Sequence, residues 1–129
     1  MLKPNLEIAL RSCCLCPRNC KVDRLAGERG YCGQGDELRI ARAGLHFWEE
    51  PCISGTAGSG TVFFAGCNLH CVYCQNYGIV EGTAGRVISE EELAVVFLRL
   101  QKEGANNINL VTPTHFAFQV AHALEIAKD

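Results

Sequence analysis

The sequence predicts an α/β fold in which two buried strands alternate with two amphipathic helices. Residues 61–65 form a short apolar run with β-branched and aromatic side chains, and residues 108–112 form a similar run. Both runs are typical of buried strands. Between them, Ser89 begins a segment whose apolar residues recur with helical spacing. Strands that alternate with helices favour right-handed βαβ units and a parallel sheet.

Three segments precede the first buried strand. Residues 2–11 predict one short helix, and the weak alternation of residues 38–43 predicts a strand. Residues 53–60 are rich in Gly and Ser, which favours a flexible connector. This connector lacks the Gly-Lys-Ser/Thr ending that a phosphate-binding P-loop requires, so we expect no nucleotide site there.

Each buried strand is followed by a predicted helix. In the first helix, Ser89 and Glu92 have the spacing of a capping box, and Gly104 supplies the stop signal. Its inward face is expected to consist of Leu93, Val96, Phe97 and Leu100. Thr114 is the expected cap of the second helix. The expected inward residues of that helix are Phe116, Val120, Ala123, Leu124 and Ala127.

The composition indicates one globular domain and argues against several classes of protein. The chain has 129 residues, of which 48% are hydrophobic and 20% are charged, and its net charge is −2. These values argue against an intrinsically disordered chain and against a nucleic-acid-coating protein. The N-terminus lacks the apolar stretch of a signal peptide, and no apolar run is long enough to span a membrane. We therefore expect a cytoplasmic protein without a nucleic-acid or membrane partner.

The unusual feature of the composition is its nine cysteines, which crowd into two short windows. This pattern favours metal or iron–sulfur binding over a secreted disulfide framework. In the second window, Cys67, Cys71 and Cys74 have Cys-X3-Cys-X2-Cys spacing. A [4Fe–4S] cluster and a structural zinc ion normally take four protein ligands, so three thiolates would leave one iron of a cluster open. The alternatives are zinc with His70 as fourth ligand and a redox pair formed by Cys71 and Cys74.

The first window contains four cysteines at X2, X3 and X11 spacing, Cys13, Cys16, Cys20 and Cys32. Four thiolates suit a structural zinc ion and a second iron–sulfur cluster equally well, and a segment without metal is the third alternative. The remaining Cys14 and Cys52 are expected to be small core residues. His115 has no ligand-like spacing, and we expect it to be a helix cap or a surface residue.

The second window resembles the signature of radical S-adenosylmethionine (SAM) enzymes, Cys-X3-Cys-X-aromatic-Cys, with Tyr73 at the aromatic position. The surrounding sequence resembles the subgroup related to pyruvate formate-lyase activating enzymes. The segments that carry this closer resemblance are Gly60 to Asn68, Cys74-Gln75-Asn76-Tyr77, Trp48-Glu49-Glu50-Pro51 and the upstream Cys-X2-Cys-Pro-Arg-X-Cys element with its Gly-Tyr-Cys partner.

The resemblance implies that the chain is the N-terminal part of a partial TIM-type barrel preceded by a Cys-rich, turn-rich segment. Residues 1–52 would be the Cys-rich segment, and residues 53–129 would supply the first two βα units of the radical SAM domain. A complete TIM barrel has eight such units in roughly 250 residues. We therefore expect an incomplete fragment whose open sheet favours aggregation or dimerisation.

The resemblance also implies the chemistry. Cys67, Cys71 and Cys74 would hold a [4Fe–4S] cluster whose open iron chelates the amino and carboxylate groups of SAM. One electron, from a donor such as flavodoxin or ferredoxin, would cleave SAM to methionine and a 5′-deoxyadenosyl radical. This radical would remove a hydrogen atom from a substrate, for which the resemblance suggests a protein glycine or another C–H donor. The polypeptide would position and shield the reactants.

Three residues are the expected SAM contacts. The resemblance places Tyr73 beside the adenine. Many relatives carry Gly-Gly-Glu after the second strand, where this chain has Thr112-Pro113-Thr114-His115. The hydroxyls of Thr112 and Thr114 can accept hydrogen bonds from the amino group instead.

The competing hypothesis is a zinc-ribbon interaction protein without catalysis, whose basic first third docks on another macromolecule.

Overall fold

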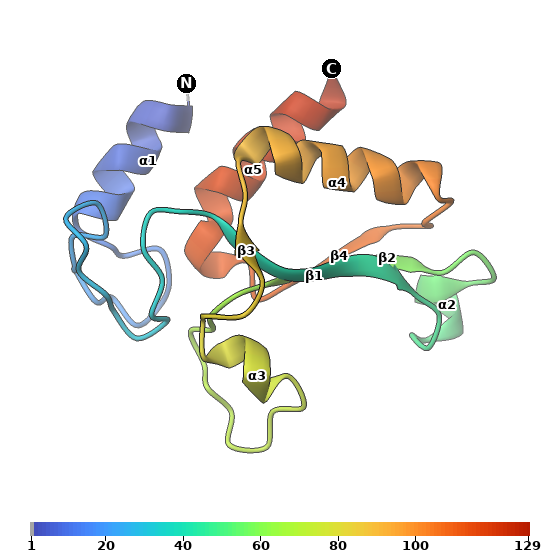
Figure 1. The fold of residues 1–129 in the computed structure, drawn as a ribbon, viewed down its shortest axis with the longest axis horizontal. Helices are drawn as coiled ribbons and strands as arrows, with labels where there is room; N and C mark the ends of the chain where they lie inside the picture. The colour runs from blue at the N-terminus through green and yellow to red at the C-terminus, as the bar shows by residue number, and fades with distance from the viewer. Residues whose placement is uncertain (1) are drawn as a thin grey trace.

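The computed structural model describes residues 2–129 (Figure 1). Its elements are, in order, α1 (Leu2–Arg11), β1 (Arg39–His46), α2 (Pro51–Ser54), β2 (Ser59–Phe64), α3 (Tyr77–Val80), β3 (Arg86–Val87), α4 (Glu90–Lys102), β4 (Ile108–Val111), the 3-10 helix η1 (Thr114–Phe116) and α5 (Ala117–Lys128). Residues 12–38 form turns that carry the first cysteine window. The predicted helix over residues 2–11 is confirmed, and the predicted strand over residues 38–43 is confirmed as the longer β1.

The sheet is mixed, with the strand order β3-β1-β2-β4. β1 runs antiparallel to β2 and β3, whereas β2 and β4 pair in parallel, from Gly60 opposite Ile108 to Phe63 opposite Val111. The two buried strands that the sequence predicts are thus parallel neighbours. Because the carboxyl ends of parallel strands lie at one edge of a sheet, the segments after β2 and β4 meet there.

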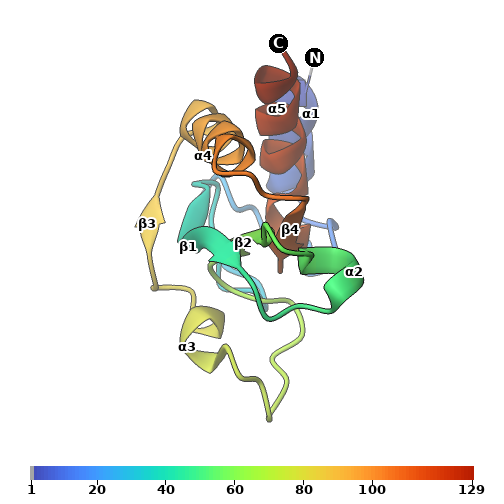
Figure 2. The same ribbon diagram turned by 90° about the vertical axis from the view of Figure 1, so that its right-hand side faces the viewer.

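The helices divide between the two sides of the sheet. α1, α4 and α5 lie on one side, and α3 with its neighbouring loop lies on the other (Figures 1 and 2). α5 contacts both α1 and α4. The core lies between the sheet and these helices and contains Leu38, Ile40, Val62, Phe64, Ile88, Leu93, Phe97, Leu100, Phe116, Val120 and Ala123.

The predicted capping box at the start of α4 is confirmed. The Glu92 amide donates to the Ser89 hydroxyl at 3.0 Å, and the Ser89 amide donates to the Glu92 carboxylate at 2.7 Å. α4 ends just before Gly104, whose φ of +93° is favourable only for glycine. The ends of α4 are therefore determined by local residues.

Two predictions on local structure are wrong. Residues 53–60 are not a plain connector, because Pro51 opens the short helix α2 and β2 already begins at Ser59. Gly60 can pair with β4 because a Cβ atom there would lie only 3.0 Å from the Asn107 carbonyl. Thr114 begins η1 rather than capping the last helix, and no side-chain hydrogen bond within residues 2–129 caps α5.

The burial of several side chains also differs from expectation. Leu124 is 49% exposed, because α5 turns Val120 and Ala123 to the core instead. Cys14 and Cys52 are exposed and do not belong to the core, since they lie on turns and on the short helix α2. His115 is buried, not on the surface, because η1 lies under the loop that follows β2. No helix within residues 2–129 has the length and apolar character needed to cross a membrane.

Candidate metal centre

The second cysteine window is the loop that follows β2. Cys67 is buried, and Cys71 and Cys74 are half-buried. Gly66 turns the chain out of the strand with a φ of +79°, and a Cβ atom there would lie 2.7 Å from the Cys32 carbonyl. This close approach requires glycine, and it brings the start of the loop against the N-terminal segment.

Backbone N–H groups contact two of the three sulfurs in this loop. The Leu69 amide donates to Cys67 Sγ at 3.3 Å, and the Asn76 amide donates to Cys74 Sγ at 3.4 Å. Such hydrogen bonds stabilise thiolates and are among the contacts that set the potential of an iron–sulfur cluster. The loop therefore presents sulfur ligands that its own backbone already supports.

His70 lies between the first two of these cysteines and has an unusual conformation. Its φ is +57°, which is unfavourable for a residue with a Cβ atom. Its ring stacks on Tyr31 with centroids 4.2 Å apart. His70 Nε2 is buried and has no hydrogen-bond partner within residues 2–129. A buried polar atom of this kind normally finds a partner in the protein, in water or in a bound group.

Among the described residues, no three Cys, His, Asp or Glu side chains converge closely enough to hold a single metal ion. The thiolates of a [4Fe–4S] cluster bind different irons, so they stand farther apart than the ligands of one ion. The fit of the second window to a cluster therefore depends on its donors. These are three sulfurs, two N–H groups directed at them, and the unpartnered imidazole nitrogen of His70.

The residues expected to contact SAM lie in two places. Thr112 follows β4 with a φ of +54°, and its hydroxyl donates to the carbonyls of Phe64 and Gly66, each at 3.2 Å. Thr112 is thus next to the start of the cysteine loop, and its oxygen can still accept protons. Thr114 is half-buried at the start of η1, and Tyr73 is 87% exposed on the loop.

A cleft of about 350 Å³ lies against the sheet beside the cysteine loop. Its walls come from β1, β2 and β4 and from the residues that directly follow Cys74. The lining residues are Arg42, His46, Glu49, Thr61, Phe63, Gln75, Asn76, Asn109 and Val111. A small polar molecule could enter this cleft and remain next to the second window.

The four cysteines of the first window are half-buried. Backbone pairing of Cys13 with Lys21 and Val22, at 2.9 and 3.0 Å, folds the segment into a tight hairpin-like turn. Cys20 Sγ accepts the Tyr31 amide at 3.5 Å, which connects the middle of this segment to its end.

The surroundings of the Cys32 thiol, in the first window, shift its pKa. Burial raises the pKa of this thiol above its ordinary value. The Gln34 backbone and the Arg24 guanidinium oppose that rise in pKa. The Cys13 and Cys16 thiols add to it, because a neighbouring negative charge disfavours a second thiolate.

A buried arginine connects the first window to η1. Arg24 is 1% exposed, and it donates to the Gly35 carbonyl at 2.9 and 2.6 Å and to the His115 carbonyl at 2.7 Å. It also contacts Cys13 Sγ at 3.7 Å. His115 Nε2 in turn donates to the Ala65 carbonyl at 2.6 Å, just before the cysteine loop. The sequence offered no signal for this long-range network.

His115 is neutral near pH 7. Burial, opposed by the hydrogen bond to Ala65 and assisted by the nearby Arg24 charge, lowers the pKa of its imidazole to about 4. Because a carbonyl can only accept, Nε2 carries the proton. Nδ1 is buried without a hydrogen-bond partner within residues 2–129.

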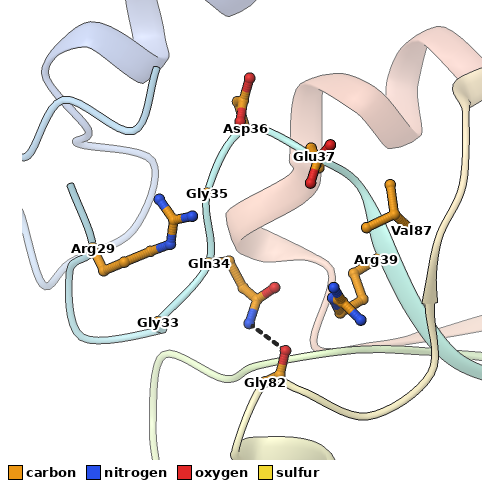
Figure 3. A pocket seen from close by; sticks show the side chains of 9 residues that line it. All are labelled: Arg29, Gly33, Gln34, Gly35, Asp36, Glu37, Arg39, Gly82 and Val87. Atoms are coloured by element: carbon orange, nitrogen blue, oxygen red, sulfur yellow. Dashed lines mark hydrogen bonds between the residues drawn. The ribbon is translucent and has the colours of Figure 1, made fainter. Parts of the chain in front are cut away.

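Gln34 makes another contact between the N-terminal segment and the second window (Figure 3). Its amide donates to the Gly82 carbonyl at 3.1 Å, within a pocket of about 180 Å³. A Cβ atom on Gly66 would lie 2.7 Å from Gln34 Cγ. Gln34 therefore packs closely against the glycines that flank the cysteine loop on either side.

Comparison with known proteins identifies the matched part of the chain. The family model described as 4Fe-4S single cluster domain matches residues 53–129. The chain belongs to the 4Fe-4S single cluster domain family. It is therefore an iron–sulfur protein with a metal-binding domain for one [4Fe–4S] cluster.

One relative of uncharacterized function extends the match into the N-terminal segment. An uncharacterized protein of Methanocaldococcus jannaschii is 32% identical over 125 residues, which cover 85% of this chain and 35% of that protein. The chain thus spans about a third of the length of the curated relative it matches. No solved structure matches the chain.

Proposed function

We propose that the protein is a radical SAM enzyme whose cluster is held by Cys67, Cys71 and Cys74. The observation that supports this proposal is the number of cysteines available as ligands. The part of the chain that matches the cluster family, residues 53–129, contains these three cysteines and no other. A [4Fe–4S] cluster normally takes four thiolates. One iron then has no cysteine ligand and can bind an exogenous molecule.

The residues of the chain have distinct roles in this proposal. A bound cluster supplies one-electron chemistry and a chelation site for amino and carboxylate groups. The Leu69 and Asn76 amides support the sulfurs, and the Thr112 hydroxyl oxygen accepts a hydrogen bond from the SAM amino group. Tyr73 packs on the adenine, and Thr114 lines the same edge of the sheet. The overall reaction is reductive cleavage of SAM to methionine and a 5′-deoxyadenosyl radical, which takes hydrogen from a substrate.

The fold supports this proposal through its parallel pair of strands. We assign β2 with α4, and β4 with α5, as the first two βα units of a partial barrel within residues 53–129. Residues 1–52 are the Cys-rich segment that precedes it. The flanking motifs favour the subgroup of pyruvate formate-lyase activating enzymes. A cytoplasmic location, a flavodoxin or ferredoxin as electron donor and a C–H donor such as a protein glycine as substrate follow from the same assignment.

The first window is a candidate for a second metal centre. Its four cysteines lie outside the matched residues, and the pairing of Cys13 with Val22 and the contact of Cys20 with the Tyr31 amide fold them into one segment. A tetrathiolate binds zinc or a second iron–sulfur cluster. The metal content of the anaerobically purified protein distinguishes these two, because a second cluster raises iron to about eight per chain whereas zinc leaves it at about four.

The proposal is tested by SAM cleavage in the anaerobically reconstituted protein. Dithionite and SAM are expected to give methionine and 5′-deoxyadenosine. Cys71→Ala is expected to lose this activity and the corresponding iron. The exposed Cys14→Ala and Cys52→Ala are matched controls, which are expected to retain both. A Cys71→Ala variant with full iron content and an unchanged cluster signal would overturn the ligand assignment.

A further inference from the structure

The N-terminal segment donates hydrogen bonds to backbone carbonyls of the turn between Cys67 and Cys71. Arg18 Nε donates to the Asn68 carbonyl at 2.9 Å, and Arg18 Nη2 contacts the Leu69 carbonyl at 3.4 Å. Arg18 lies in the first cysteine window, fifty residues earlier in the chain. One guanidinium thus spans two consecutive carbonyls of the cluster loop.

Tyr31 reinforces this contact from the same segment. The Arg18 guanidinium lies 3.7 Å from the centre of the Tyr31 ring. The other face of that ring stacks on His70 at 4.2 Å and 25°, and the Tyr31 hydroxyl contacts the Leu69 carbonyl at 3.5 Å. Arg18, Tyr31 and His70 therefore form a three-layer stack across the two windows.

His70 has two unusual properties at this stack. Its positive φ is uncommon for a residue with a Cβ atom and is stabilised where surrounding contacts support it. The Tyr31 ring and the two carbonyl contacts of Arg18 lie directly against this turn. They also fix an imidazole whose Nε2 is buried and unpartnered within residues 2–129, between two proposed cluster ligands.

We propose that Arg18 and Tyr31 are positioning residues which hold the Asn68–His70 turn in its cluster-binding conformation, and that His70 Nε2 hydrogen-bonds to the bound group. The N-terminal segment is then part of the metal centre. This inference rests on the proposed assignment of Cys67 and Cys71 as ligands. The Arg18 charge also favours the reduced, more negative form of the cluster, because its guanidinium contacts the carbonyl of Asn68, the residue next to Cys67.

The contact of Arg18 and Tyr31 with the Asn68–His70 turn is called the clamp. It is first tested in the metal-free protein by amide hydrogen exchange. Arg18→Ala is expected to speed exchange at the Leu69 and Cys74 amides by at least about tenfold, the effect of losing one hydrogen bond from a charged donor. Arg29→Ala is the matched control, since Arg29 is an exposed arginine of the same segment whose guanidinium donates to the neighbouring Glu28 carbonyl. Equal exchange in the two variants would overturn the clamp.

The second test uses the cluster itself. In the reconstituted protein, Arg18→Ala is expected to shift the reduction midpoint to more negative potential and to alter the electron paramagnetic resonance spectrum, and Arg29→Ala to change neither. His70→Phe keeps a ring to stack on Tyr31 but lacks Nε2, so it is expected to alter the spectrum while amide exchange stays slow. Tyr31→Phe keeps the stack and loses only the hydroxyl contact to Leu69, so it is expected to speed amide exchange less than Arg18→Ala does.

The outcomes separate this inference from the proposed function. If the cluster responds to Arg18→Ala but SAM is not cleaved, the clamp stands and the enzyme assignment fails. If SAM is cleaved and neither midpoint nor spectrum changes in Arg18→Ala or His70→Phe, the clamp is wrong and the enzyme assignment stands.

Discussion

The imidazole of His115 lies beneath the loop that follows β2. In the structure it is 2% exposed and donates to the Ala65 carbonyl at 2.6 Å. Its position depends on η1 and on Arg24, which are brought there by tertiary packing.

The burial of His115 predicts a pH dependence of stability. The folded chain binds this proton only near pH 4, whereas the ordinary value is 6.5. Between these values the unfolded chain holds more protons, so the free energy of unfolding falls as pH decreases from 6.5 to 4. The total loss is on the order of 3 kcal/mol. Urea denaturation of the metal-free, reduced protein across this range measures it.

His115→Gln is the informative variant for this prediction, because glutamine can still donate to Ala65 but does not titrate. Its stability is expected to change less between pH 6.5 and 4 than that of the original chain. His46→Gln, a partly exposed histidine, is the control and is expected to keep the original slope. Identical slopes in all three proteins would show that His115 is not the responsible group.

Among the elements, α4 was predictable because the signals that define it lie within its own sequence. Ser89, Glu92 and Gly104 fix its ends, and the apolar spacing fixes its inward face. The short elements α2, α3 and β3 were missed, because two to four residues carry no periodic pattern. β2 begins at Ser59 because Gly60 can approach the Asn107 carbonyl closely, a contact between distant segments.

The capping box of α4 predicts a measurable loss when it is broken. Ser89→Ala removes the acceptor for the Glu92 amide and is expected to lower the free energy of unfolding by about 1 kcal/mol. Because Ser89 is exposed, little packing is lost with its hydroxyl. Glu92→Ala breaks the reciprocal bond, so the double variant is expected to lose less than the sum of the single losses. Strict additivity in urea denaturation would contradict a reciprocal box.

At the scale of the whole molecule, the two cysteine windows lie together although they are far apart in sequence. Arg18 and Tyr31 contact the turn before Cys71, Gln34 packs against Gly66, and Arg24 reaches η1. The sequence predicted each window separately. It could not predict their contact, because the contact is made by side chains whose partners are backbone carbonyls. Every residue has a backbone carbonyl, so the residue types do not show which carbonyl a side chain contacts.

Arg24 predicts how strongly the N-terminal segment contributes to global stability. Arg24→Met keeps much of the side-chain volume but leaves the Gly35 and His115 carbonyls without their buried donor. The expected loss in free energy of unfolding is roughly 3 kcal/mol, measured by urea denaturation of the reduced protein. Arg29→Met, on the exposed surface, is expected to change stability by less than about 0.5 kcal/mol. Equal stability of the two variants would contradict the role of Arg24.

We propose that one iron of a cluster held by Cys67, Cys71 and Cys74 is open to SAM. The most direct measurement is the electron paramagnetic resonance spectrum of the reconstituted, dithionite-reduced protein before and after addition of SAM. SAM is expected to change this spectrum, because its amino and carboxylate groups join one iron. A reducible [4Fe–4S] cluster whose spectrum is identical with and without SAM would contradict the claim.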